Sequence, residues 1–316
     1  MSGMGLWSKV VDFFTLPESP VPLGIFRIFF GLLCLSSALL LYPDAATWLS
    51  SGGVMPESIG LQHFGANRLN IFRWLGSSAS AVFVFMTIFI FASLSLAIGW
   101  FPRVSAAAVA ICLTSIAHRN IYILSSADTL MRVVAWFLVI APSGAAVSVD
   151  RLIRVARGTA QPGVIGDESP LGRRMIQLQL CLLYLATGVA KSKGEMWQSG
   201  TAVYLVQQMT EFERFPIPSF LHTALASKVL TWGTLAIESS FPLLVWHRAT
   251  RKIILGAAFG LHLGLEYAMN IQLFQPAILC ILGLFLTEKE LRGIARAVHK
   301  RVPFFFTRNE PPVRAS

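Results

Sequence analysis

The chain has 316 residues, of which 54% are hydrophobic and only 13% are charged, and its mean hydropathy is +0.63. Soluble domains carry about 25% charged residues, so this composition excludes an ordinary soluble domain and indicates a polytopic membrane protein. The net charge of +10 does not indicate a nucleic-acid partner, because the basic residues are concentrated in short loops and the tail, as the positive-inside rule describes.

Hydropathy along the chain predicts an all-α membrane bundle of about eight transmembrane helices. The expected spans are 22–41, 78–100, 104–117, 123–141, the apolar part of 173–204 that ends at Lys191, 229–246, 253–269 and 273–286. An amphipathic cytoplasmic lead (1–21) precedes this membrane domain (22–287), and a basic cytoplasmic tail (288–316) follows it.

Basic residues cluster between the fourth and fifth spans and again between the sixth and seventh. Arginines and lysines favour the cytoplasmic side, so both termini are expected in the cytoplasm. The 42–77 and 191–227 loops are then expected outside. The four cysteines are isolated within apolar segments, which favours buried, inert thiols over a metal or redox site.

Ionisable residues inside the predicted spans cost about 2.5–3.5 kcal/mol each on insertion scales, so they usually face a partner within the bundle. Those of this chain are Arg27, Asp128, Arg132, Glu238, His262 and Glu266. The spacing of four residues predicts that Asp128 pairs with Arg132. The same spacing favours Glu266 as a carboxylate that orients His262 for acid–base chemistry, with a hydrogen-bonded core histidine as the alternative. Glu238 is a candidate partner for Arg27 or a helix-packing group.

The 173–204 stretch carries the most informative pattern. An apolar helix with an internal Tyr184 ends abruptly at Lys191, Lys193 and Trp197. Such an end is typical of a helix that leaves the hydrocarbon at an aromatic interface, where lysines act as anchors. The same arrangement can hold an ammonium group over a buried pocket.

Several blocks of the sequence resemble the horizontally transferred transmembrane (HTTM) domain family. In chain order they are LGIFRIFFGLL, GGVMP, HRNIYILSSADTLMRVVAWFLVIAPSGAAVSVDR, QLQLCLLYLATGVAKSKGEMWQSGTAVY, ESSFPLLVWHRATRK and HLGLEYAMNIQLF. Together they cover nearly the whole chain, from Pro22 to Leu286. The resemblance therefore implies the family's helical membrane fold.

The best understood relatives in this family are the vitamin K-dependent gamma-carboxylases, and the resemblance implies a similar site. It places Lys191 on the lysine that deprotonates the hydroquinone, with Lys193 as a substitute. The family's histidine falls on Asn120, and His118 is two residues away. Together with the charge pattern, this gives Lys191, Lys193, His262 and Asn120 as candidate catalytic residues. The candidate substrate- or cofactor-binding residues are Trp197, Tyr184, Glu238, Asn270 and His118. The implied cofactor is a reduced quinone such as vitamin K hydroquinone.

Two functions follow from the resemblance. In the first, a membrane enzyme of the bacterial inner membrane points the Lys191 amine into a lipid-accessible cavity near the outer face. In the second, the chain is a non-catalytic accessory protein for maturation or export of a secreted peptide, similar to the sporulation-delaying protein B type. The lumenal portion that binds carboxylase substrates is absent from this sequence, which leaves the second function open. It predicts a peptide groove lined by Trp197, Phe212 and Phe215.

Overall fold

The computed structural model describes residues 5–56, 58–59 and 68–301. Parts of the predicted lead (1–4), of the 42–77 loop (57 and 60–67) and of the basic tail (302–316) lie outside this range. Over the described residues, the regular structure is helical, and pairing of extended segments is limited to two isolated bridges, Glu18 with Glu168 and Glu213 with Met269. The all-α prediction is therefore confirmed.

Eight helices correspond in order to the eight predicted spans. They are α2 (Val21–Leu41), α6 (Ala79–Ile98), α7 (Pro102–Arg119), α8 (Ser126–Ile140), α10 (Leu171–Ser192), α13 (Ala224–Leu244), α14 (Arg251–Ala268) and α15 (Phe274–Gly283). Three segments of the described chain are long and apolar enough to cross a membrane: Val21–Leu49, Ala79–Ile98 and Leu171–Ser192, with mean hydropathies of 2.1, 2.5 and 1.2. These helices establish the membrane character of the chain, and the count of about eight spans stays a prediction.

Shorter elements join or flank these helices. They are α1 (Leu6–Thr15), η1 (Tyr42–Asp44), α3 (Ala45–Leu49), α5 (Phe72–Leu75), η2 (Ile121–Ile123), α9 (Val149–Ala156), α11 (Glu195–Gln198), α12 (Ala202–Gln207), η3 (Thr210–Phe212), η4 (Ser219–His222) and α16 (Glu288–Arg301). The third and fourth spans separate within the predicted gap between 117 and 123, since α7 ends at Arg119 and Asn120 has an extended backbone before η2.

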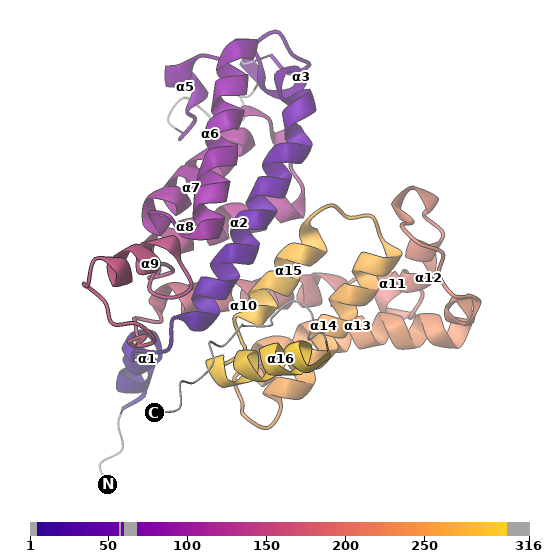
Figure 1. The fold of residues 1–316 in the computed structure, drawn as a ribbon. Coiled ribbons are helices and arrows are strands. Elements are labelled where there is room, and N and C mark those ends of the chain that lie inside the picture. Colours follow the sequence, from indigo (N-terminus) through magenta and orange to yellow (C-terminus); the bar gives the residue numbers. More distant parts are fainter. Residues whose placement is uncertain (1–4, 57, 60–67, 302–316) are drawn as a thin grey trace.

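The first four long helices form one group, and the last three lie beside it (Figure 1). Helix α10 connects the two groups, because it packs against α8, α13 and α15. Helix α1, the α13–α14 turn and the start of α16 lie together at one end of the bundle, which we call the terminal end. The opposite end, which we call the loop end, includes the end of α2 and the start of α8.

Small residues allow the helices of the first group to approach closely. A Cβ atom built on Gly31 of α2 would lie 2.5 Å from the backbone nitrogen of Ala97 in α6. No side chain fits in that space, so glycine sets the distance between these two helices. Membrane helices commonly use small residues in this way, because close backbone approach increases van der Waals contact.

Arg27 is fully buried and binds backbone carbonyls instead of a carboxylate. Its guanidinium donates hydrogen bonds to the carbonyl oxygens of Val147 at 2.6 Å and Ser143 at 3.0 Å, with Ala97 farther away at 3.4 Å. Ala97 lies in the last turn of α6, and Ser143 and Val147 come after the end of α8. Carbonyl groups at such positions accept no hydrogen bond within a helix. The prediction that Glu238 serves Arg27 is therefore wrong, and the carboxylate that interacts with Arg27 electrostatically is Asp150.

The predicted ion pair between Asp128 and Arg132 is also wrong over the described residues. Asp128 instead accepts hydrogen bonds from the backbone nitrogen and the hydroxyl of Ser125, both at 2.7 Å. This is a capping box at the start of α8, where the carboxylate satisfies the free N–H of the N-cap residue. A local partner of this kind is three residues away and outcompetes a flexible arginine.

Candidate functional site

One face of α10 carries the residues that define the candidate site. Gln177, Tyr184 and Lys191 are seven residues apart in turn, so they lie along the same side of the helix. Gln177 and Tyr184 are buried, with exposed fractions of 1% and 2%. Gly188 lies between Tyr184 and Lys191, and a Cβ atom there would meet the Ser239 hydroxyl at 2.9 Å. This close contact brings α13 near enough for Lys191 to reach it.

The Lys191 amine forms an ion pair with Glu238 of α13. The Nζ–Oε1 distance is 2.5 Å, the side chain of Glu238 is 7% exposed and that of Lys191 is 26% exposed. The second carboxylate oxygen, Oε2 of Glu238, is buried and has no hydrogen-bond partner among the described residues. Burying an acceptor without a partner is costly, so this oxygen is an unsatisfied polar group inside the cluster.

An aromatic ring covers the same amine. The chain turns at Gly194 after α10, and α11 brings Trp197 back so that Lys191 Nζ lies 4.9 Å from the centre of the indole ring. A cation at this distance is attracted to the ring face by about 0.5–1 kcal/mol or more. Lys191 is therefore held from two sides, by a carboxylate and by an indole. Lys193 is exposed at the end of the helix.

A chain of buried hydrogen bonds lies next to this pair. The Nδ1 atom of His262 donates to Oε1 of Gln275 at 2.5 Å, which leaves Nε2 to accept from the Tyr184 hydroxyl at 2.7 Å. Glu238 interacts electrostatically with both Tyr184 and His262. The carboxamide of Gln275 thus fixes the tautomer of the neutral imidazole, as second-shell partners of histidine generally do.

The predicted partnership of His262 with Glu266 is wrong. The Glu266 carboxylate pairs with Arg214 from the segment that follows α12, and this segment also bridges to the end of α14. One helical turn separates Glu266 from His262, yet His262 points inward and is 3% exposed while Glu266 lies nearer the surface. A spacing of four residues placed His262 and Glu266 on similar sides of α14, but each side chain binds a residue of another segment.

Gln275 is 1% exposed and completes the hydrogen-bond chain, and it was not predicted as a site residue. A signal was present, because Gln275 is the only polar side chain in the apolar stretch FQPAILCILG of α15. Isolated polar residues in membrane helices usually have a specific partner. The ring of Phe241, which packs edge-on against Tyr184 with centroids 4.7 Å apart, gave no signal beyond its hydrophobicity.

The remaining predicted residues lie toward the loop end. Asn120 is 1% exposed and donates to the Trp48 carbonyl at 3.1 Å, while His118 contacts the Leu69 carbonyl at 2.7 Å. Both therefore hold the segments that follow α2. Asn270 is exposed and lines a separate cavity.

This cavity, which we call the loop-end cavity, has a volume of about 500 Å³. Its walls include Trp48, Asp44, Asp128, Phe212 and Asn270. Lys191 is not among the lining residues, so the amine does not enter this cavity as the enzyme hypothesis expected. The described residues of the predicted site thus divide into a Lys191–Glu238 cluster within α10–α15 and a second group at the end of α7.

The helices and the buried charged cluster define the class of the protein: it is a helical integral membrane protein with an ionisable site at the end of a membrane-length helix. A family model for the HTTM domain matches residues 16–289, which is most of the chain, and the protein belongs to the HTTM domain family. This family is related to the carboxylases, and the match confirms the resemblance seen in the sequence. No curated protein and no solved structure matches the chain.

Proposed function

We propose that this protein is a membrane enzyme in which Lys191 and Glu238 together form the acid–base centre. The observation that supports this proposal is the buried Lys191–Glu238 pair with its unpartnered carboxylate oxygen. The protein would lie in a bacterial inner membrane and cross it several times, with both termini in the cytoplasm. The concentration of arginines at the terminal end supports that orientation.

The pair can supply a base without a net change in its charge. Moving one proton from the Lys191 ammonium to the Glu238 carboxylate gives a neutral amine and a carboxylic acid. Low-dielectric surroundings favour such a neutral pair relative to two charges, because burial removes the hydration of both ions. The amine lone pair can then accept a proton from a substrate hydroxyl, and the cation formed is held by Trp197.

A reduced quinone would fit this site, because it has hydroxyl groups that donate hydrogen bonds and an apolar ring. Glu238 Oε2 would accept a hydrogen bond from a phenolic hydroxyl, and the neighbouring Tyr184, Trp197 and Phe241 rings offer apolar contact surfaces. When bound, the hydroquinone would supply the acidic hydroxyl and the reducing power of the reaction. The protein's own task would be to hold that hydroxyl at Glu238 Oε2 on binding. Once the proton has moved within the pair, the hydroxyl would turn its hydrogen bond to the neutral Lys191 amine, which accepts the proton.

The decisive variant is Lys191→Arg. Arginine preserves the positive charge and the ion pair with Glu238, but its guanidinium does not lose a proton in proteins. With purified protein in lipid nanodiscs, the wild type should accelerate the oxidation of a naphthohydroquinone by dissolved oxygen. Lys191→Arg should reduce that acceleration by about 10²–10⁴, which is the usual contribution of a general base.

Lys193→Arg is the matched control, because it makes the same chemical change two residues away on an exposed side chain. It should leave the rate unchanged. If Lys191→Arg and Lys193→Arg both retain the wild-type rate, Lys191 is not the base. If the wild type itself gives no acceleration over empty nanodiscs, this quinone chemistry does not belong to the protein.

A second candidate function is an accessory role in maturation or export of a secreted peptide. The supporting observation is a run of exposed aromatic residues after α12: Phe212, Phe215 and Phe220 have exposed fractions of 39%, 50% and 67%. Phe212 also lines the loop-end cavity, whereas Trp197 covers Lys191. Under this function an apolar peptide encoded nearby should co-purify with the protein, Phe220→Ser should release it, and Lys191→Arg should not.

A further inference from the structure

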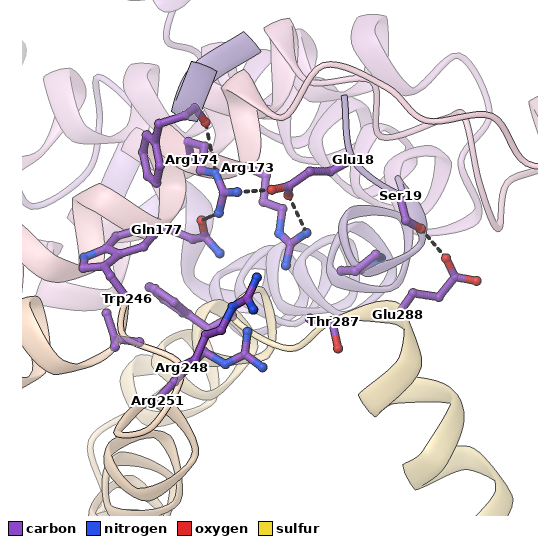
Figure 2. A pocket seen from close by; sticks show the side chains of 14 residues that line it. Glu18, Ser19, Arg173, Arg174, Gln177, Trp246, Arg248, Arg251, Thr287 and Glu288 are labelled. Atoms are coloured by element: carbon purple, nitrogen blue, oxygen red, sulfur yellow. Dashed lines mark hydrogen bonds and ion pairs between the residues drawn. The ribbon is translucent and has the colours of Figure 1, made fainter. Parts of the chain in front are cut away.

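A cavity of about 540 Å³ opens at the terminal end of the bundle (Figure 2). Neither Lys191 nor Glu238 is among the residues that line it. Four arginines line it: Arg173 and Arg174 from α10, Arg248 from the α13–α14 turn and Arg251 from the first turn of α14. Two carboxylates, those of Glu18 and Glu288, also line it, so the lining carries a formal excess of two positive charges. Arginine guanidinium groups that converge on a cavity are typical of sites for phosphate or carboxylate.

The two carboxylates are already engaged by other groups. Glu18 pairs with both Arg173 and Arg174. Glu288 accepts a hydrogen bond from Ser19 and pairs with Arg292, which lies outside the cavity lining. Neither carboxylate is therefore available to Arg248 or Arg251, whose side chains Figure 2 shows extending toward the cavity.

These two arginines keep unused hydrogen-bonding capacity. Arg251 pairs with Glu290 through one terminal nitrogen, but its Nε atom is buried and has no partner among the described residues. Arg248 is exposed and forms no ion pair within the described part of the chain. A ligand with several acceptor oxygens would bind the Arg248 guanidinium and the terminal nitrogen of Arg251 that does not pair with Glu290.

The helix termini around the cavity add to its positive potential. The cavity lining includes residues of the first turns of α2, α10, α14 and α16, and each helix start carries about half a positive charge. Helices usually balance this charge with acidic residues in the first turn, but α2, α10 and α14 have none. Instead α10 and α14 place arginines there, which adds to the positive potential of the cavity.

Part of the cavity wall is apolar and aromatic. Phe13, Val245, Trp246 and Phe285 line it, and the ring centroids of Phe13 and Trp246 are 5.2 Å apart. A tryptophan beside basic residues is typical of the level at which lipid headgroups meet the hydrocarbon. Basic pockets between membrane helices bind anionic headgroups by this combination of charge and apolar contact.

We infer that the terminal-end cavity is a binding site for a phosphate group, with Arg248 and Arg251 contacting its oxygens. The phosphate would come from the headgroup of an anionic phospholipid or from a free phosphate. The apolar wall is accounted for by a lipid, whose acyl chains would continue along it. This site is independent of the reaction proposed for Lys191.

The test compares Arg248→Gln with Lys252→Gln in the full-length protein. Each variant removes one positive charge near the start of α14, but Lys252 is exposed and does not line the cavity. Because Arg248 has no ion pair among the described residues, its loss should leave the fold intact, which far-UV circular dichroism would verify. Phosphatidylglycerol and phosphatidylcholine are titrated separately into detergent-solubilised protein, and retained lipid is measured by native mass spectrometry. Inorganic phosphate is tested in parallel by its protection against thermal unfolding.

The expected result is that the wild type retains phosphatidylglycerol in preference to phosphatidylcholine. Arg248→Gln should lower the affinity for phosphatidylglycerol about tenfold, the value for one charged hydrogen bond, while Lys252→Gln keeps the wild-type affinity. Protection by inorganic phosphate that Arg248→Gln alone abolishes, without lipid preference, would assign the site to free phosphate. Equal effects of the two variants on both ligands, or no binding of either ligand, would overturn the inference.

Discussion

Replacing Arg27 with methionine tests whether backbone carbonyls are what hold this buried charge. Two of its hydrogen bonds, to Val147 and Ser143 at 2.6 and 3.0 Å, are of normal length, and the third, to Ala97 at 3.4 Å, is weak. Hydrogen bonds to charged groups contribute about 1.5–3 kcal/mol each, so two of them amount to about 3–6 kcal/mol. Methionine fills part of the volume and avoids burying a guanidinium, so the expected loss is about 3 kcal/mol.

The free energy of unfolding can be measured by titrating sodium dodecyl sulfate into mixed micelles and following helicity by circular dichroism. Arg132→Met is the control, because Arg132 is half-buried and makes no ion pair or side-chain hydrogen bond within the described residues. Its substitution should change stability by less than about 0.5 kcal/mol. A loss below about 1 kcal/mol for Arg27→Met would refute the reasoning, since the carbonyls would then need no guanidinium.

Two further predictions concern helix contact and pH. Gly188→Val should push α10 away from Ser239 and so separate Lys191 from Glu238. Gly233→Val is the control, because nothing lies within 4 Å of a Cβ atom at that position. The yield of a crosslink between cysteines placed at 191 and 238 would report the distance, and equal yields in the two variants would contradict the prediction. Hydrogen bonds from Ser19 and Arg292 lower the pKa of the Glu288 carboxyl in α16 below its ordinary value of 4.5. The stability from this carboxylate is thus present above pH 4.5 and is lost as the pH falls through the lowered pKa. Ser19→Ala should reduce the acid-induced loss of stability, and unfolding curves that have the same pH dependence with and without Ser19 would contradict this.

Hydropathy was sufficient to locate the long helices, because a run of apolar residues near 20 long has few alternatives to a helix in a membrane protein. Boundaries were less accurate: α13 begins at Ala224, five residues before the predicted 229, because Thr223 accepts a hydrogen bond from Ala226 and acts as the N-cap. Cap geometry of this kind depends on a single hydroxyl in a polar loop, which hydropathy does not register.

Partners across helices could not be read from spacing. Neither of the predicted i, i+4 pairs is present among the described residues. Asp128 binds the N-cap residue of its own helix, and His262 binds Gln275 of another helix. The Lys191–Glu238 pair joins residues 47 positions apart and depends on how α10 and α13 pack. Lys191 and Glu238 could each be predicted as polar groups in need of a partner, but their association is a property of the three-dimensional fold.

Glu18 has a consequence for the order in which the chain assembles. It binds Arg173 and Arg174, and 155 residues separate it from the first of these. Ribosomes add about 5–20 residues per second, so on the order of 8–30 s pass between the synthesis of the glutamate and that of its arginines. During that interval the corner between α1 and α2 has no permanent counter-ion. The contact that joins this corner to α10 therefore forms only after Arg173 and Arg174 have been synthesised.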